Sequence, residues 1–88
     1  MPPVVLITGA ARRIGAVMAR AFAQAGWHVV IHAGHSPEAA HALAAELPSA
    51  EVMVCDLSDG DAAVAMIAEL AGRLDDWRLL INNAAVFR

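Results

Sequence analysis

A turn that combines glycines, arginines and a threonine is the stretch of this sequence best suited to binding chemistry. It follows the apolar run of residues 4–7, and its candidate contact residues are Thr8, Gly9, Arg12, Arg13, Ile14 and Gly15. A strand that stops at Gly9 and a helix that begins near Ile14 bring backbone N–H groups and the positive end of a helix dipole to one place. The pattern predicts a site for a phosphate or pyrophosphate group.

The glycines of this turn match a dinucleotide-binding fingerprint only in part. Gly9 permits a sharp turn, and Gly15 permits close packing of the helix. The match to G-x-G-x-x-G is imperfect, because only Gly9 and Gly15 are present and Arg13 stands where a middle glycine is expected between them. Two glycines alone are a weak signal, and their place directly after a first strand strengthens it.

Polar residues also follow two later apolar runs. Asp56 follows residues 51–55, and the pair Asn82-Asn83 closes the run that begins at Arg78. In a parallel sheet the carboxyl ends of the strands meet at the edge where ligands bind. Asp56 fits a ligand contact and a cap of the following turn equally well. The asparagines fit either a ligand contact or a tight strand end.

Histidines and a single cysteine are the other reactive residue types. Of the four histidines only His32 and His35 have a short, ligand-like spacing, and no carboxylate or thiol flanks them. We therefore expect no metal site. Cys55 lies in an apolar stretch and has no partner for an internal disulfide, so we interpret it as a small buried side chain.

The elements that must position these residues alternate between strands and helices. Strands are predicted at residues 4–7, 27–32, 51–55 and 78–82, and helices begin near Ile14, at Ser36-Pro37 and at residues 58–61. The expected apolar stripes are Ile14, Val17, Met18, Ala21 and Phe22; Ala40, Leu43, Ala44 and Leu47; and Val64, Ile67, Ala68, Ala71 and Leu74. Near-continuous apolar strands separated by helices indicate a parallel sheet covered on both faces. We predict an α/β, Rossmann-like half with strand order 3-2-1-4, formed as one domain by residues 1–88.

Composition excludes several classes of protein. The 88 residues are 59% hydrophobic and carry a formal charge of −3, and the six arginines are scattered. A nucleic-acid partner is not expected from such a surface. No apolar segment approaches the roughly 18 residues of a membrane span, and the first residues do not resemble a secretory signal. We expect a soluble, cytoplasmic protein with no membrane partner.

Three motifs together resemble the short-chain dehydrogenase/reductase family, in its order and spacing. They are Thr8-Gly9 with Gly15, Asp56-Leu57, and Asn82-Asn83-Ala84. The resemblance covers the whole chain and corresponds to the N-terminal, cofactor-binding part of the family. Within it, the sequence is most similar to the pteridine reductase group, through residues 8–15, 31–36 and 82–87.

The resemblance implies roles for individual residues. The implied cofactor contacts are Thr8, Gly9, Arg12, Arg13, Ile14, Gly15, His35, Ser36, Asp56, Leu57, Asn83 and Ala84. Asp56 and Leu57 would hold the adenine, and His35 and Ser36 would lie near the adenosine 2′-phosphate. Arg13 would also reach the substrate, and Phe87 would stack on a pteridine or similar ring.

The residue types around the second strand favour NADP as the cofactor. An NAD-binding site usually places an acid at the end of this strand, where it would repel a 2′-phosphate. Here no acid occurs before Glu38, and Arg12 and Arg13 lie across the turn. The pteridine group usually has an arginine between the residues that correspond to His35 and Ser36, and Arg12 is the candidate replacement.

The resemblance also implies a missing catalytic apparatus. The family's chemistry uses a tyrosine, a lysine four residues later and a serine, and this chain has no tyrosine and no lysine. We expect the parent to be an NADP-dependent reductase acting on a pteridine or similar carbonyl or imine substrate. The 88 residues alone would be inactive, and would self-associate or pair with the missing C-terminal part. The alternative is a small non-catalytic protein that binds a dinucleotide or a partner.

Overall fold

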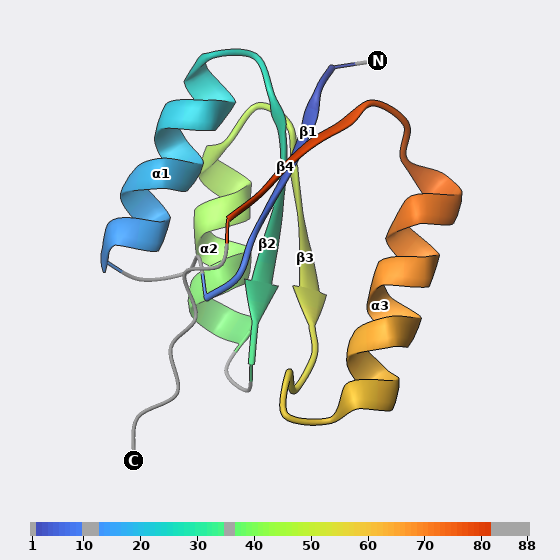
Figure 1. The fold of residues 1–88 in the computed structure, drawn as a ribbon. Coiled ribbons are helices and arrows are strands. Elements are labelled where there is room, and N and C mark those ends of the chain that lie inside the picture. The colour runs from blue at the N-terminus through green and yellow to red at the C-terminus, as the bar shows by residue number, and fades with distance from the viewer. Residues whose placement is uncertain (1, 10–12, 35–36, 82–88) are drawn as a thin grey trace.

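Strands and helices alternate along the whole of the chain that the computed structural model describes, residues 2–9, 13–34 and 37–81 (Figure 1). The elements are β1 (Val4–Ile7), α1 (Arg13–Gln24), β2 (His28–Ala33), α2 (Pro37–Glu46), β3 (Ala50–Val54), α3 (Gly60–Arg73) and β4 (Trp77–Ile81). The predicted strands are confirmed, with three of them shifted by one residue. Within the described ranges, no helix has both the length and the apolarity needed to cross a membrane.

The four strands form one parallel sheet in the order β3-β2-β1-β4, as predicted. Helices α1 and α2 cover one face of this sheet, and α3 lies on the other face (Figure 1). The pairing of β1 with β4 steps from Trp77 opposite Val4 to Leu79 opposite Val5. Arg78 is thus an extra residue of β4 without a partner in the register of β1, as in a β-bulge.

Both faces of the sheet are apolar because each has its own helical cover. Along β1, Val5 and Ile7 pack toward the alanine-rich faces of α1 and α2. Val4 and Leu6 belong to a second cluster, with Met66 and Leu70 of α3. Alternate residues of one strand therefore enter opposite cores, which explains why the strand reads as an unbroken apolar run.

The predicted helical stripes are only partly correct. Helix α1 buries Gly15, Ala16, Ala19 and Ala23, whereas Ile14 and Val17 are 69% and 65% exposed. Small side chains let the helix approach the sheet closely, so the alanine face is the one that packs. In α3 the buried residues are Met66 and Leu70, while Val64 and Ile67 are exposed. The stripe of α2 is correct for Ala40 and Leu43, which are buried.

The predicted helix starts at Pro37 and near residue 59 are confirmed. Pro37 is the first residue of α2. Asp59 is the N-cap of α3, with an extended backbone, and its side chain accepts a hydrogen bond from the Ala62 N–H at 3.2 Å. This bond satisfies one of the N–H groups that a helix leaves unpaired at its start.

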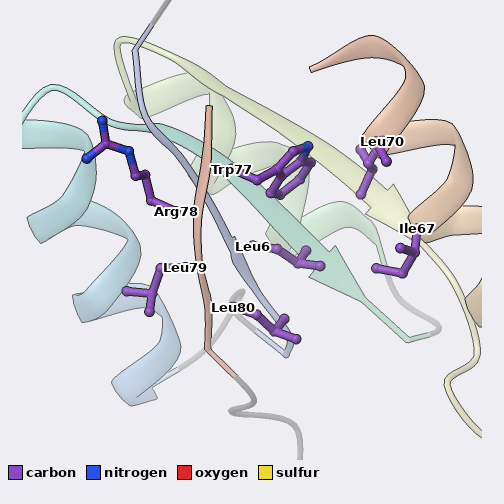
Figure 2. A pocket seen from close by; sticks show the side chains of 8 residues that line it. Leu6, Ile67, Leu70, Trp77, Arg78, Leu79 and Leu80 are labelled. Carbon is purple, nitrogen blue, oxygen red and sulfur yellow. The ribbon is translucent and has the colours of Figure 1, made fainter. Parts of the chain in front are cut away.

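An apolar hollow lies between α3 and β4 (Figure 2). Its volume is about 270 Å³, and it is lined by Leu6, Ile67, Leu70, Ala71, Trp77, Arg78, Leu79 and Leu80. In Figure 2, Trp77 and Leu80 point to the α3 side of β4, whereas Arg78 and Leu79 point to the other side. Leu80 is 60% exposed, so α3 covers the sheet face incompletely at this end of β4.

Candidate functional site

The carboxyl ends of the parallel strands bring the predicted site residues to one edge of the sheet. Thr8 and Gly9 follow β1, Ala33 ends β2, and Asp56 lies two residues beyond β3. Thr8 is buried, and its N–H and Oγ1 both donate to the Ile81 carbonyl oxygen, at 3.0 and 3.4 Å. This pair of bonds holds the end of β1 against the end of β4.

Gly9 turns the chain away from the sheet. Its φ is 61°, in the left-handed region that costs glycine little. Its N–H donates to Nδ1 of His32 at 3.1 Å, so this amide is directed toward the sheet edge. The predicted role of Gly9 as the turning residue is supported by this geometry.

His32 is a central residue of this edge that the sequence analysis did not identify. His32 is only 2% exposed, and its Nε2 lies 2.7 Å from the Cys55 carbonyl oxygen. Because a carbonyl can only accept, Nε2 carries a proton; because the Gly9 amide donates, Nδ1 carries a lone pair. His32 is therefore the neutral, Nε2-protonated tautomer. A histidine inside an otherwise apolar buried strand was the available signal.

Arg13 occupies a backbone conformation that normally favours glycine. It is the first residue of α1, its φ is 52°, and it is exposed. The position corresponds to the missing middle glycine of the fingerprint, so the sequence pattern and the backbone agree. Beyond it, Gly15 is buried and Ile14 is exposed, as a closely packed helix start requires.

Asp56 forms the cap that was one of its two predicted roles. Its Oδ1 accepts hydrogen bonds from the Ser58 N–H at 2.9 Å and from the Ser58 hydroxyl at 2.7 Å. Asp56 is exposed, and neighbouring Leu57 is 38% exposed. The cap fixes the carboxylate at the sheet edge, and a ligand contact stays a prediction. Cys55, just before it, is buried as expected.

Six of the predicted contact residues lie outside the described residues. They are Arg12, His35, Ser36, Asn83, Ala84 and Phe87. The described part of the site is therefore the Thr8-Gly9 turn, the start of α1, the buried His32 and the Asp56-Leu57 segment. These segments meet at the carboxyl edge of the sheet, and their contact with a ligand stays a prediction.

The opposite, amino edge of the sheet is held by side chains. The His28 ring contacts the Ser49 hydroxyl at 2.7 Å and the Glu51 carboxylate at 2.8 Å, and Arg73 donates to Glu51 at 2.6 Å. Burial by itself would raise the pKa of Glu51, but the hydrogen bonds and charges of Arg73 and His28 outweigh it, so the pKa is lowered. The same contact raises the pKa of the exposed Arg73.

Comparisons with known proteins identify the family. The short chain dehydrogenase family matches residues 3–88. The chain is 42% identical over 83 residues to sorbitol dehydrogenase of Cereibacter sphaeroides. This match covers 93% of the chain and 32% of that enzyme. It is 39% identical to serine 3-dehydrogenase of Agrobacterium fabrum, over 98% of this chain and 34% of that enzyme. The chain thus spans about a third of these relatives.

Solved structures show the same fold. A metagenomic short-chain oxidoreductase, determined in complex with NADP, superimposes with a TM-score of 0.84 at 38% identity. The match covers 96% of this chain and 39% of that one. A family match over nearly every residue, joined to the predicted sheet order and the left-handed turn before α1, leads to one conclusion: this chain belongs to the short-chain dehydrogenase family.

Proposed function

We propose that these 88 residues form the NADP-binding, N-terminal part of an oxidoreductase that reduces a carbonyl or imine substrate. The observation that carries the proposal is the turn at residues 8–13, where Gly9 and Arg13 both have left-handed backbones in front of α1. Helix α1 follows β1 at the carboxyl edge of the sheet, and the positive end of its dipole suits a bound phosphate. A pyrophosphate bound there would be the ligand of the turn, with Arg13 beside it.

Asp56 and Leu57 are the proposed adenine contacts. Both lie at the same edge, beyond β3, and β3 is two strands away from β1 in the sheet. The Ser58 hydroxyl and amide hold one oxygen of the Asp56 carboxylate. The exposed Asp56 carboxylate is the proposed acceptor for an adenine amino group. Asn83 and Ala84 are proposed to lie beside the bound cofactor, after β4.

The preference for NADP rests on charge at the end of β2. The residues from His32 to Pro37 include no acid, and Arg12 and Arg13 supply positive charge across the turn. Arg12, His35 and Ser36 form the proposed 2′-phosphate site. The metagenomic relative in complex with NADP supports this choice for a protein of the same family.

Calorimetric titration of the chain with NADP⁺ and NAD⁺ tests the proposal. We expect tighter binding of NADP⁺, and Arg12→Ala should weaken NADP⁺ selectively, by about 1–3 kcal/mol for a lost charge-assisted hydrogen bond. Arg20→Ala is the matched control, because Arg20 pairs with Glu46 on the exposed side of α1 at 3.1 Å. Equal affinities for the two cofactors, or an equal effect of both variants, would refute the NADP assignment.

The chemistry of reduction is proposed for a longer parent. Without tyrosine and lysine, the 88 residues should bind cofactor and show no NADPH oxidation with ketone or dihydropteridine substrates. The relatives named above are dehydrogenases of sorbitol and serine. A pteridine substrate, stacked on Phe87, stays a prediction carried by the sequence motifs alone, as does a cytoplasmic location.

The apolar hollow beside β4 is the proposed contact for further polypeptide, either a second copy or the remainder of the parent. Trp77, Leu79 and Leu80 are all partly exposed there, and in the described chain β4 pairs with β1 alone. An open strand edge beside apolar side chains favours association. Sedimentation at micromolar concentration should show self-association of the wild type, and Leu80→Glu should reduce it. Val17→Glu is the control, because Val17 is similarly exposed but lies on α1, and it should leave self-association unchanged. A wild-type monomer would contradict self-association.

A further inference from the structure

The ring of His32 connects two segments of the proposed cofactor site. Its Nδ1 accepts from the Gly9 N–H at 3.1 Å, and its Nε2 donates to the Cys55 carbonyl oxygen at 2.7 Å. Gly9 begins the proposed pyrophosphate turn, and Cys55 directly precedes Asp56, the proposed adenine contact. Each partner is 23 residues away from His32 in sequence.

One ring nitrogen of His32 acts as an acceptor and the other as a donor. A buried carbonyl oxygen needs a donor and a partly buried N–H needs an acceptor, and one neutral imidazole supplies both in a fixed geometry. A proton added to Nδ1 would remove the acceptor and set two donors against each other. The Gly9 contact therefore depends on the lone pair of Nδ1 and on nothing else in the ring.

We propose that His32 is a positioning residue that sets the orientation of the cofactor-binding turn through the Gly9 amide. This inference rests on the proposed function and deepens it. Gly9 and Arg13 both adopt left-handed backbones within five residues, and a turn with such values needs external anchors to keep one conformation. The bond from the Gly9 N–H to His32 anchors the start of this turn at the carboxyl edge of the sheet.

Two substitutions separate the two contacts. Asparagine carries an acceptor oxygen on Cγ, where histidine carries Nδ1, so His32→Asn preserves an acceptor for the Gly9 amide. Glutamine places its amide one bond further out, at the reach of Nε2, so His32→Gln preserves a donor for the Cys55 carbonyl. Each variant loses one buried hydrogen bond, and both should lose similar stability.

Cofactor affinity distinguishes the variants. We expect NADP⁺ to bind His32→Asn within about threefold of the wild type and His32→Gln about tenfold more weakly, since His32→Gln removes the acceptor that orients the Gly9 N–H. His28→Asn is the control, because His28 lies on the same strand at the amino edge and bonds only to Ser49 and Glu51 among the described contacts of its ring. It should change the unfolding midpoint without changing affinity.

Nitrogen NMR of the His32 ring provides a readout that is independent of the cofactor. The wild type should show an unprotonated Nδ1 and a protonated Nε2, and the Gly9 amide proton should shift in His32→Gln and stay close to its original value in His32→Asn. Equal loss of affinity in both variants, or no loss in either, would overturn the inference and leave the proposed function standing. Absence of NADP⁺ and NAD⁺ binding to the wild type would refute the proposed function, and this inference with it.

Discussion

Two histidines on one strand show how differently the two edges of this sheet are built. His28 and His32 are four residues apart in β2, so both side chains point to the face covered by α3. His28, at the amino edge, contacts the side chains of Ser49 and Glu51, whereas His32, at the carboxyl edge, contacts backbone groups of Gly9 and Cys55. The amino edge is closed by its own side chains, while at the carboxyl edge the buried ring of His32 connects backbone groups that follow β1 and β3.

Removal of the two rings should give the largest contrast. His32→Leu leaves the Gly9 N–H and the Cys55 carbonyl without the ring, and should lower the free energy of unfolding by about 2–4 kcal/mol. His28→Leu should cost about 1 kcal/mol, because water reaches its half-buried partners. Urea unfolding of both variants measures the difference. Equal losses would show that the edges do not differ in this way.

Acid should weaken the amino edge first. The pKa of Glu51 is lowered in the folded chain, so its contribution to stability is complete above its unfolded value near 4.5 and is lost as the pH falls through the folded value. Glu51→Gln should cost up to about 1 kcal/mol at neutral pH. The difference in free energy of unfolding between wild type and variant should shrink below pH 4.5. Urea unfolding at several pH values across the acid range measures this difference. A difference that is constant with pH would exclude the ion pairs as its cause.

The smallest expected effect concerns two non-glycine residues that have left-handed backbones within the described ranges, one at each edge. Arg13 has a φ of 52° before α1, and Asp76 has a φ of 51° before β4. Arg13→Gly should relieve strain and change stability by less than about 1 kcal/mol, because glycine also loses more entropy on folding. It should nevertheless weaken NADP⁺ binding, whereas Asp76→Gly should not. The same calorimetric titration separates the two edges, and equal affinities in both variants would count against a ligand role for Arg13.

Local patterns were sufficient to predict the sheet and its order. The apolar run of β1 and the alternation with helices determine a covered parallel sheet. The assignment of the edge at Gly9 as the ligand edge stays a prediction. The left-handed conformation of Arg13 was not predicted, although the sequence analysis had noted that a middle glycine is expected at this position.

Features that depend on distant partners were not predicted. The role of His32 requires knowledge that Gly9 and Cys55, each 23 residues away, come to its two nitrogens. The packing face of α1 was predicted from its large residues, yet the close distance to the sheet selects Ala16, Ala19 and Ala23 and exposes Ile14. Neither outcome can be obtained from periodicity, because each depends on the tertiary distance between elements.

Amide NMR spectra recorded during titration with NADP⁺ test the central claim most directly, because they report both edges of the sheet at once. We expect the largest shift changes at Gly9, Arg13, Ile14, Gly15 and the Asp56-Leu57 segment, with little change at His28, Glu51 and Arg73 at the amino edge. Changes centred on the amino edge, or no change at saturating cofactor, would contradict the assignment of the carboxyl edge as the NADP site.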